Sequence, residues 1–478
     1  MSGHSFRELR RWTPRGDPFA QRVTVTGEEN PRGAYVLYWA QSARRLRNNL
    51  ALEYAIELAN ARNVPVVVYE SLRPDYPHAN DRIHAFVLEG VRQNAADAAA
   101  RGLHYHFFLP RTAHEARGVV RKLAAAARCV VTDDYPTSII AAQTARFVAA
   151  SPVAVHRVDG NGILPMRLFG KELYSARFLR DRAHASFRER WPALEEREPR
   201  KRFRGALDLP RYDGAHPRDA ARGCPIDHRV APVPAIGGRD AALARLGAFV
   251  EDGLRGYANE RNKSLRHLSG LSPYLHFGHI GIHEIAAYVL RSSAPDEDVD
   301  AFLEESIIRR ELSFNLCFYN SRYDSIEALP SWARATLDAH RRDRRKPSYT
   351  YEELEAAQTY DAVWNLAQRQ LLARGTIHGY LRMLWGKKIL EWSESPEAAL
   401  AAMIRLHDVY AIDGRDPNTY AGVLWCLGKH DRPWVPERPI FGTIRWMSSE
   451  QSAKKVRLAE LEALVDGGAQ QSLLGSKR

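Results

Sequence analysis

The sequence predicts two domains of different class, an α/β domain near the N-terminus and an all-α domain near the C-terminus. In residues 33–160, short apolar runs rich in Val alternate with amphipathic segments, which is typical of parallel strands separated by helices. From residue 241 onward, apolar residues recur with a period near 3.6, which indicates helices. A chain of 478 residues is also too long for one hydrophobic core.

The N-terminal pattern predicts a Rossmann-like parallel sheet of five strands with helices on both faces. Ligands of such sheets bind at the carboxyl ends of the strands. The sequence after the first strand contains no G-x-G-x-x-G or Walker A loop, so a standard dinucleotide or triphosphate site is not expected there. The predicted strands span 35–40, 65–71, 103–109, 129–135 and 153–160, and the predicted helices span 48–63, 80–101, 114–127 and 137–150.

The remaining stretches set the domain boundaries. The segment before residue 241 is rich in Arg, Pro and Gly and lacks periodicity, so we expect a long interdomain connection draped over the surface. Polar residues at both ends predict a flexible arm and a tail whose last helix is exposed. The predicted organisation is an arm at 1–32, the α/β domain at 33–160, a linker at 161–240, the helical domain at 241–455 and a tail at 456–478.

The composition is that of a globular protein with a basic surface. Lys and Arg outnumber Asp and Glu by 69 to 57, a formal net charge of +12, which is typical of a polyanion binder or of a basic, Arg-rich proteome. The four cysteines form no C-x-x-C pair, which argues against a disulfide scaffold or a structural zinc site. The sequence has no apolar signal core and no apolar run of about 18 residues, so we expect a cytoplasmic protein that does not span a membrane.

Six of the ten tryptophans lie between Trp364 and Met447, interleaved with charged residues. Tryptophan carries an N–H that needs a partner, so its repeated use beside charge favours rings chosen for their π-systems. Trp385 and Trp392 are seven residues apart and would share one helix face, with Trp364 on an earlier helix. This spacing fits either a row of side chains packed into the hydrophobic core or a chain of rings for electron hopping.

Two other segments carry polar groups with two interpretations each. Ser269, Gly270 and Ser272 offer hydroxyls and backbone N–H groups to a diphosphate near a helix start, or they form an ordinary cap and turn. Glu305 and Arg309 lie four residues apart on a predicted helix. They form either a surface ion pair or a carboxylate facing a ligand pocket, and the pattern does not choose between these.

Two long motifs resemble the signature regions of class II cyclobutane pyrimidine dimer DNA photolyases, within the photolyase and cryptochrome family. The motifs are FLEESIIRREL (302–312) and GKHDRPWVPERPIFGTIRWMS (428–448), and the resemblance extends over roughly 33–455. It implies an antenna-type N-terminal domain, a helical domain that binds FAD, and a second chromophore that is a deazaflavin or a folate. It also implies a monomer, without an obligate protein partner, that repairs dimers in double-stranded DNA by light-driven electron transfer from reduced FAD.

The resemblance also implies functions for individual positions. Those implied for FAD binding are Tyr257, Ser269, Gly270, Leu271, Ser272, Arg382, His407 and Asp413. Those implied for the lesion and the DNA are Arg261, Arg309, Trp425, Arg432, Trp434 and Arg445. Two residues implied for catalysis are Glu305, which would hydrogen-bond the dimer, and Met383, which would lie in the lesion pocket. The others are Trp385, Trp364 and Trp392, which would form a photoreduction chain from the flavin to the surface.

The chain departs from the family pattern at His407, which stands where the family usually has Asn beside flavin N5. A titratable imidazole at that position would influence which redox state of the flavin is stable. An alternative function, a cryptochrome-like photoreceptor with little repair, has His407 as its sequence support. The other departures are Leu316, Thr419, the extra residue in Val435–Pro436, Thr443 and Trp446.

Overall fold

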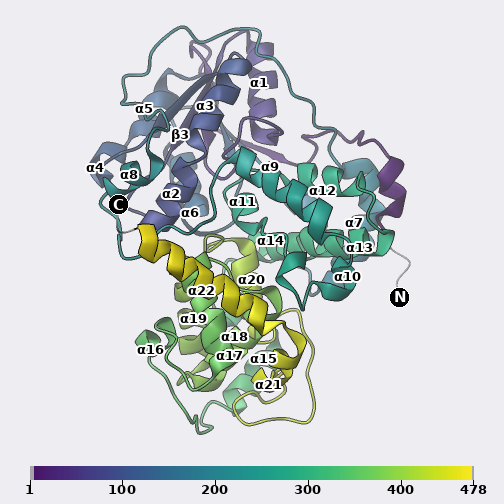
Figure 1. Cartoon of the computed structure of the whole chain (residues 1–478). Coiled ribbons are helices and arrows are strands. Elements are labelled where there is room, and N and C mark those ends of the chain that lie inside the picture. The colour runs from purple at the N-terminus through teal and green to yellow at the C-terminus, as the bar shows by residue number, and fades with distance from the viewer. Residues whose placement is uncertain (1–4, 476–478) are drawn as a thin grey trace.

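The computed structural model describes residues 5–475 and joins an α/β domain to a larger helical region (Figure 1). The predicted architecture of an α/β domain followed by helices is therefore confirmed. The outermost residues of the predicted arm and tail, 1–4 and 476–478, lie outside the described residues. The four cysteines are buried free thiols. Within the described part of the chain, no helix has the length and apolarity needed to cross a membrane.

The α/β domain is built on one six-stranded sheet with the order β1-β6-β5-β2-β3-β4. Strands β2 to β6 are parallel, as predicted, and β1 adds an antiparallel edge in which Val23 pairs with Val158. Strand β1 lies within the predicted flexible arm, because a four-residue strand with half-exposed and exposed side chains carries little apolar signal. The strands are β1 (Val23–Thr26), β2 (Val36–Ala40), β3 (Val66–Ser71), β4 (His104–Phe108), β5 (Cys129–Asp133) and β6 (Val155–Val158).

Helices cover both faces of this sheet, as a continuously apolar parallel sheet requires. Val36 and Tyr38 of β2 pack in the core that contains α1, whereas Leu37 and Trp39 pack in the core that contains α5. Asn49 caps α1 because its side-chain oxygen accepts the backbone amides of Ala51 and Leu52. The helices are α1 (Leu50–Arg62), α2 (Asp81–Leu88), α3 (Val91–Ala100), α4 (Ala113–Ala116), α5 (Val119–Ala126) and α6 (Ser138–Ala150).

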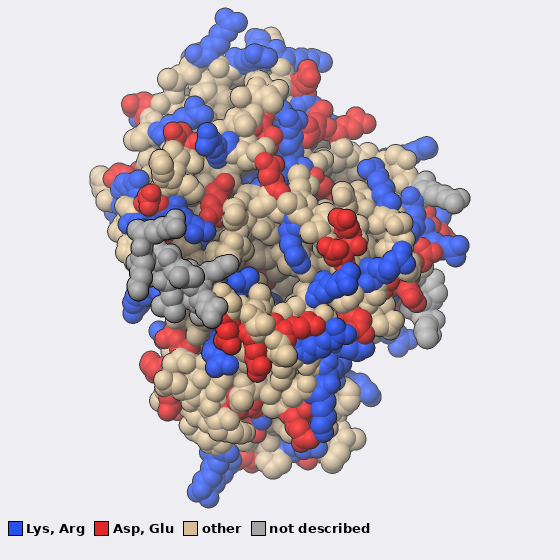
Figure 2. All heavy atoms as spheres, viewed as in Figure 1, with Lys and Arg blue, Asp and Glu red and all other residues tan. Residues whose placement is uncertain are grey.

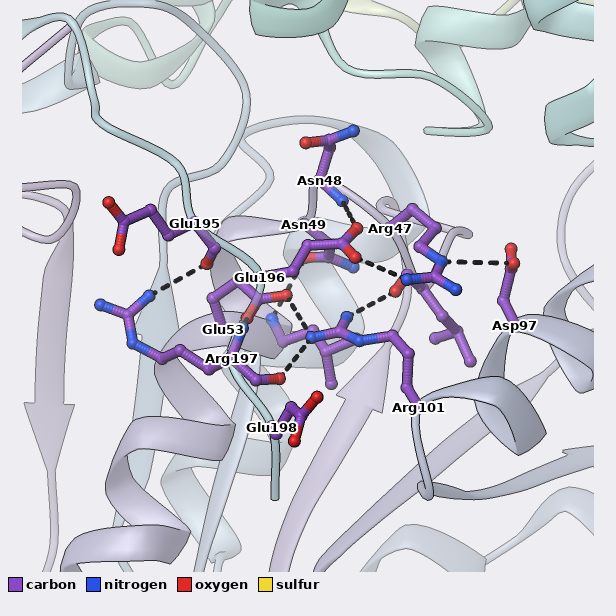
Figure 3. Close-up of polar contacts among 12 residues, drawn as sticks. Arg47, Asn48, Asn49, Glu53, Asp97, Arg101, Glu195, Glu196, Arg197 and Glu198 are labelled. Carbon is purple, nitrogen blue, oxygen red and sulfur yellow. Dashed lines mark hydrogen bonds and ion pairs between the residues drawn. The ribbon is translucent and has the colours of Figure 1, made fainter. Parts of the chain in front are cut away.

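Part of the predicted linker, Glu195–Glu198, is bound to the surface of the α/β domain by hydrogen bonds and ion pairs. Figure 3 shows Glu195–Glu198 beside α1 and its buried carboxylate, and successive contacts from Glu53 to Asn60 carry this segment along the helix. The Glu53 side chain, which is 0% exposed, pairs with Arg101 at 2.8 Å and accepts the Arg197 amide at 2.6 Å. Sequence periodicity could not show this contact, because it joins residues more than 140 positions apart. The linker interval also contains α7 (Ala176–Arg190) and α8 (Pro217–Arg222).

The helical region has two apolar cores. One core joins α7, α9, α12 and α13, and the other contains the three tryptophans of the predicted chain together with α22. The tail helix α22 buries Leu461 and Val465 on one face and leaves Glu462, Ala463 and Asp466 exposed on the other, so it is a surface helix packed against this core. The helices are α9 (Arg239–Ala248), α10 (Tyr257–Glu260), α11 (Ser272–His276), α12 (Ile282–Leu290), α13 (Asp296–Leu303), α14 (Arg310–Tyr319), α15 (Ser331–Ala339), α16 (Tyr351–Glu355), α17 (Ala362–Arg374), α18 (Gly379–Trp392), α19 (Pro396–Tyr410), α20 (Pro417–Cys426), α21 (Ser449–Lys455) and α22 (Leu458–Gly475).

Candidate active site

Helices α17 and α18 bring three tryptophan rings into one row, named here the tryptophan chain: Trp385, Trp364 and Trp392. The centroids of Trp385 and Trp364 lie 6.4 Å apart with an interplanar angle of 1°, and those of Trp364 and Trp392 lie 5.4 Å apart. The rings are therefore in contact, as a hopping chain needs. All three are buried, so the expectation that Trp392 reaches the surface was wrong, because two tyrosines pack against its ring.

Beside Trp385 lies a group of three polar side chains, named here the polar cluster: Arg382, His407 and Asp413. The His407 ring lies 4.9 Å from the Trp385 ring, and Arg382 Nη2 lies 3.8 Å from Asp413 Oδ2. Three buried atoms of the cluster, Arg382 Nε, His407 Nε2 and Asp413 Oδ1, have no hydrogen-bond partner among residues 5–475. A buried polar atom left unpaired costs about 1–3 kcal/mol, so three in one place indicate a site for a polar ligand.

His407 is uncharged near neutral pH. Burial, and then the positive charge of Arg382, lower its pKa to about 4. Its Nδ1 lies 3.0 Å from the Met403 carbonyl oxygen, and a carbonyl only accepts, so Nδ1 carries the ring proton. The Nε2 lone pair is therefore a buried acceptor that is free for a ligand. We predicted from the sequence that a titratable imidazole lies at this position, but the pKa of His407 is too low for the ring to titrate near neutral pH.

The turn that precedes α11 contains most of the other residues expected at the cofactor. Tyr257 is buried at the start of α10, where Asp298 accepts the flanking amides of Gly256 and Ala258 at 2.8 and 2.9 Å. Gly270 has φ +65°, and a Cβ there would lie 2.9 Å from Arg245 Nε, so the turn requires glycine. In the same turn the Ser269 carbonyl accepts from Arg245, Leu271 is buried, and α11 begins at Ser272 as predicted.

This turn and the polar cluster belong to different cores that meet near Asp413. Tyr257 and Leu271 pack in the core of α9 and α13, whereas Met383 packs in the core of the tryptophan chain. Ile412, which precedes Asp413, is buried in the first of these cores. The residues expected to bind the cofactor therefore lie along the boundary between the two helical cores.

Four side chains expected from the family resemblance to contact the lesion form a partly exposed group, named here the lesion group after that expectation: Glu305, Arg261, Arg309 and Trp425. Glu305 Oε1 lies 3.7 Å from Arg261 Nη2 and 3.8 Å from Arg309 Nε. The Arg309 guanidinium lies 5.2 Å from the centre of the Trp425 ring, and that of Arg261 lies 5.6 Å from the Tyr257 ring. Glu305 and Arg309 belong to the π-helical turn Glu304–Arg309, a distortion frequent at functional sites. The structure thus joins this group, through Tyr257, to the residues expected to bind the cofactor.

Arg180, which no sequence pattern predicted at this site, holds the acidic residue next to Glu305. Arg180 of α7 holds Glu304 with contacts of 2.5 and 3.0 Å, so Glu304 is already paired and Glu305 faces Arg261 and Arg309. No local sequence pattern predicts this pair, because α7 lies in the interval interpreted as a linker. Met383 lies one residue beyond Arg382, and its carbonyl oxygen is 3.9 Å from Cys426 Sγ, so α18 and α20 are in contact beside Trp425.

An exposed loop presents the remaining residues expected at DNA. Trp434 is held between two guanidinium groups, those of Arg432 at 4.9 Å and Arg445 at 5.0 Å from its ring centre. Its Nε1 also donates to Asp431 Oδ1 at 3.2 Å, which fixes the ring. Figure 2 shows Lys and Arg gathered along part of one face of the molecule, from the region of α10 towards that of α21. Such a surface suits a polyanion.

A cavity of about 640 Å³ lies between the sheet and the helical region. It is lined at the carboxyl ends of β2 and β3, where parallel sheets bind ligands. Trp39, Tyr69 and Phe147 form part of an aromatic wall, and Arg146 and Arg415 are among several arginines that line it. Its volume falls within the usual range for small-molecule sites.

Comparison with known proteins identifies the family of this chain, although no protein-family model matches the sequence. The deoxyribodipyrimidine photo-lyase of Methanothermobacter thermautotrophicus is 38% identical over 452 residues, which cover 94% of this chain and 98% of that protein. The protein of the same name from Oryza sativa subsp. japonica is 39% identical over 454 residues, covering 89% of this chain and 86% of that one.

Solved structures share the fold at low identity. A bacterial class III photolyase from Agrobacterium tumefaciens has a TM-score of 0.63 at 16% identity, covering 88% of this chain and 84% of that one. A cryptochrome from Synechocystis has a TM-score of 0.65 at 13% identity, covering 88% and 86%. With the lesion group, the polar cluster and the tryptophan chain arranged on this fold, the sequence relationships show that the chain belongs to the deoxyribodipyrimidine photo-lyase family.

Proposed function

We propose that this protein repairs cyclobutane pyrimidine dimers in double-stranded DNA by light-driven electron transfer, as a class II photolyase. The family relationship supports a photolyase-type activity. The observation that carries the proposal further is the lesion group, which places a carboxylate and a tryptophan ring beside residues of the cofactor set. Bound FAD would supply the electron when reduced and excited by light.

The polar cluster fits the isoalloxazine ring of FAD. Arg382 Nε is a donor, whereas His407 Nε2 and Asp413 Oδ1 are acceptors, and all three are buried without protein partners in the described chain. A ligand that satisfies them must offer both carbonyl acceptors and N–H donors, and an isoalloxazine ring offers both. Because Nδ1 of His407 carries the ring proton, Nε2 can accept from a flavin N–H without a change in charge.

The lesion group fits a pyrimidine dimer that has been turned out of the duplex. The separations of Glu305 from its two arginines exceed hydrogen-bond length, so its oxygens keep acceptor capacity for a pyrimidine N–H. Trp425 offers a face for stacking, and Arg309 orients that ring. The exposed loop of Arg432, Trp434 and Arg445 would contact the duplex around the flipped dimer.

The cavity between the sheet and the helical region supports a second, light-collecting chromophore. Its aromatic wall suits a flat ring system, and its arginines suit anionic substituents such as phosphate or carboxylate. A deazaflavin and a folate both have these features. Mass spectrometry of ligands released from the purified protein distinguishes them, and recovery of FAD as the sole chromophore would contradict a second site.

A repair assay tests the proposed function directly. The FAD-loaded, reduced protein is illuminated with blue light in the presence of a duplex that contains one thymine dimer, and restored thymines are quantified. We expect repair by the wild type and a strong loss of repair in Glu305→Gln, with FAD still bound. The matched control is Glu304→Gln, because Glu304 pairs closely with Arg180, at 2.5 Å, and its carboxylate lies 4.0 Å from Arg309 of the lesion group.

Flavin absorption without repair in the wild type would contradict the proposal and favour a photoreceptor. Equal repair by the Glu305→Gln and Glu304→Gln variants would remove Glu305 from the lesion site.

A further inference from the structure

The aromatic chain continues beyond the three tryptophans to a tyrosine at the surface. Trp392 is fully buried, and the rings of Tyr349 and Tyr360 lie 5.2 and 5.8 Å from its centroid. Tyr360 is 63% exposed, whereas Tyr349 is partly buried and its hydroxyl accepts the Tyr360 amide at 2.9 Å. The row of rings that begins at Trp385 therefore meets solvent at Tyr360.

The hydrogen-bond partners of the indoles decide where an oxidised state can be trapped. An indole that has lost an electron becomes acidic at its N–H group, and a nearby base that takes this proton traps it. Trp364 Nε1 donates to the Trp385 backbone carbonyl at 3.0 Å, and Trp385 Nε1 donates to the Gln368 amide oxygen at 2.9 Å. Neither of these oxygens is a base that could take the indole proton. Trp392 Nε1 is buried and has no partner among residues 5–475. The tryptophan chain can therefore pass an electron vacancy along but has no means of trapping it.

We propose that Tyr360 is the terminal electron donor of the chain and that loss of its phenolic proton to water traps the oxidised state there. The proposal rests on the proposed function, because it needs oxidised FAD as the light-excited electron acceptor. Trp385 gives one electron to that acceptor, Trp364 and Trp392 refill the vacancy in turn, and Tyr360 supplies the last electron. The O–H proton of Tyr360 goes to bulk water, and a thiol in solution then reduces the neutral tyrosyl radical by donating a hydrogen atom.

Tyr349 is the competing candidate, because its ring is slightly closer to Trp392. Its hydroxyl is held by the Tyr360 amide and its side chain is partly buried, so its proton has a poorer route to water. Tyr360 has the more exposed side chain, and its ring is still in contact with the chain. Proton release, rather than ring distance, favours Tyr360.

Electron paramagnetic resonance and transient absorption on the FAD-loaded, oxidised protein test this proposal in the absence of DNA. We expect a tyrosyl radical in the illuminated wild type, formed more slowly in deuterated buffer because a proton leaves with the electron. Tyr360→Phe should lose this radical and leave indole radicals that decay by recombination. The matched variant Tyr349→Phe should keep it.

Two results would overturn the proposal: indole radicals alone in the wild type, or loss of the tyrosyl radical in Tyr349→Phe with its retention in Tyr360→Phe. Because the experiment contains no DNA, either result concerns the electron chain and leaves the repair assay to decide the proposed function.

Discussion

The contact of Glu195–Glu198 with α1 gives a quantitative prediction, because α1 carries a matched pair of glutamates one turn apart. Glu53 is 0% exposed and pairs with Arg101, whose side chain is 5% exposed, at 2.8 Å (Figure 3). Glu57 pairs with Arg197 at 2.9 Å, but its side chain is 52% exposed. The two residues therefore make the same type of ion pair in different surroundings.

Replacing each glutamate by glutamine keeps its shape and removes its charge. Glu53→Gln leaves the buried Arg101 without its counter-charge, which costs about 3–5 kcal/mol. Glu57→Gln breaks a solvent-exposed pair, which is worth less than about 1 kcal/mol. For a domain of this size, 1 kcal/mol shifts the thermal midpoint by about 2–4 °C, so we expect Glu53→Gln to lower it by roughly 10 °C and Glu57→Gln by no more than about 4 °C.

Thermal unfolding followed by circular dichroism at neutral pH and fixed salt measures both variants. Raising the salt concentration should reduce the small effect of Glu57→Gln and leave that of Glu53→Gln nearly unchanged, because buried pairs are screened much less. Equal shifts in the two variants would refute the reasoning, since they would mean that the buried pair contributes no more than the exposed one.

Three further predictions concern the functional site. Trp385→Phe should abolish photoreduction of oxidised flavin and preserve repair by chemically reduced protein; photoreduction at the wild-type rate would place the electron path elsewhere. Because folding lowers the pKa of His407 from 6.5 to about 4, its contribution to stability is complete above pH 6.5 and is lost as pH falls towards 4. His407→Asn should therefore lose less stability than the wild type between pH 6.5 and 5 in denaturant titrations, and parallel losses would contradict a buried neutral imidazole. Arg432→Ala should weaken binding to undamaged duplex and reduce the slope of log affinity against log salt by about 1, whereas an unchanged slope would exclude a phosphate contact.

The amino-acid sequence predicted the fold class and the positions of strands β2 to β6 along the chain. Val-rich runs separated by amphipathic helices have few stable arrangements, so local pattern was sufficient there. The sequence also determined that Trp385 and Trp392 share one helix, because their spacing equals two helical turns. The family resemblance that rests on the two long motifs predicted the residues of the lesion group and the polar cluster. The spacing of Glu305 and Arg309 alone did not distinguish a surface ion pair from a carboxylate that faces a ligand pocket.

Tertiary structure decided the features that depend on contacts between distant segments. Strand β1 is held by its pairing with β6, and Glu195–Glu198 by the buried Glu53, and neither contact has a local signature. The pKa of His407 is lowered by burial and by Arg382 on another helix. Residue type alone predicted an imidazole that titrates near neutral pH. The end of the aromatic chain was likewise decided by packing, because Trp392 is buried by tyrosines that precede it in sequence by more than 30 residues. Local pattern specifies secondary structure through backbone periodicity, whereas burial and electrostatics depend on which distant side chains come together on folding.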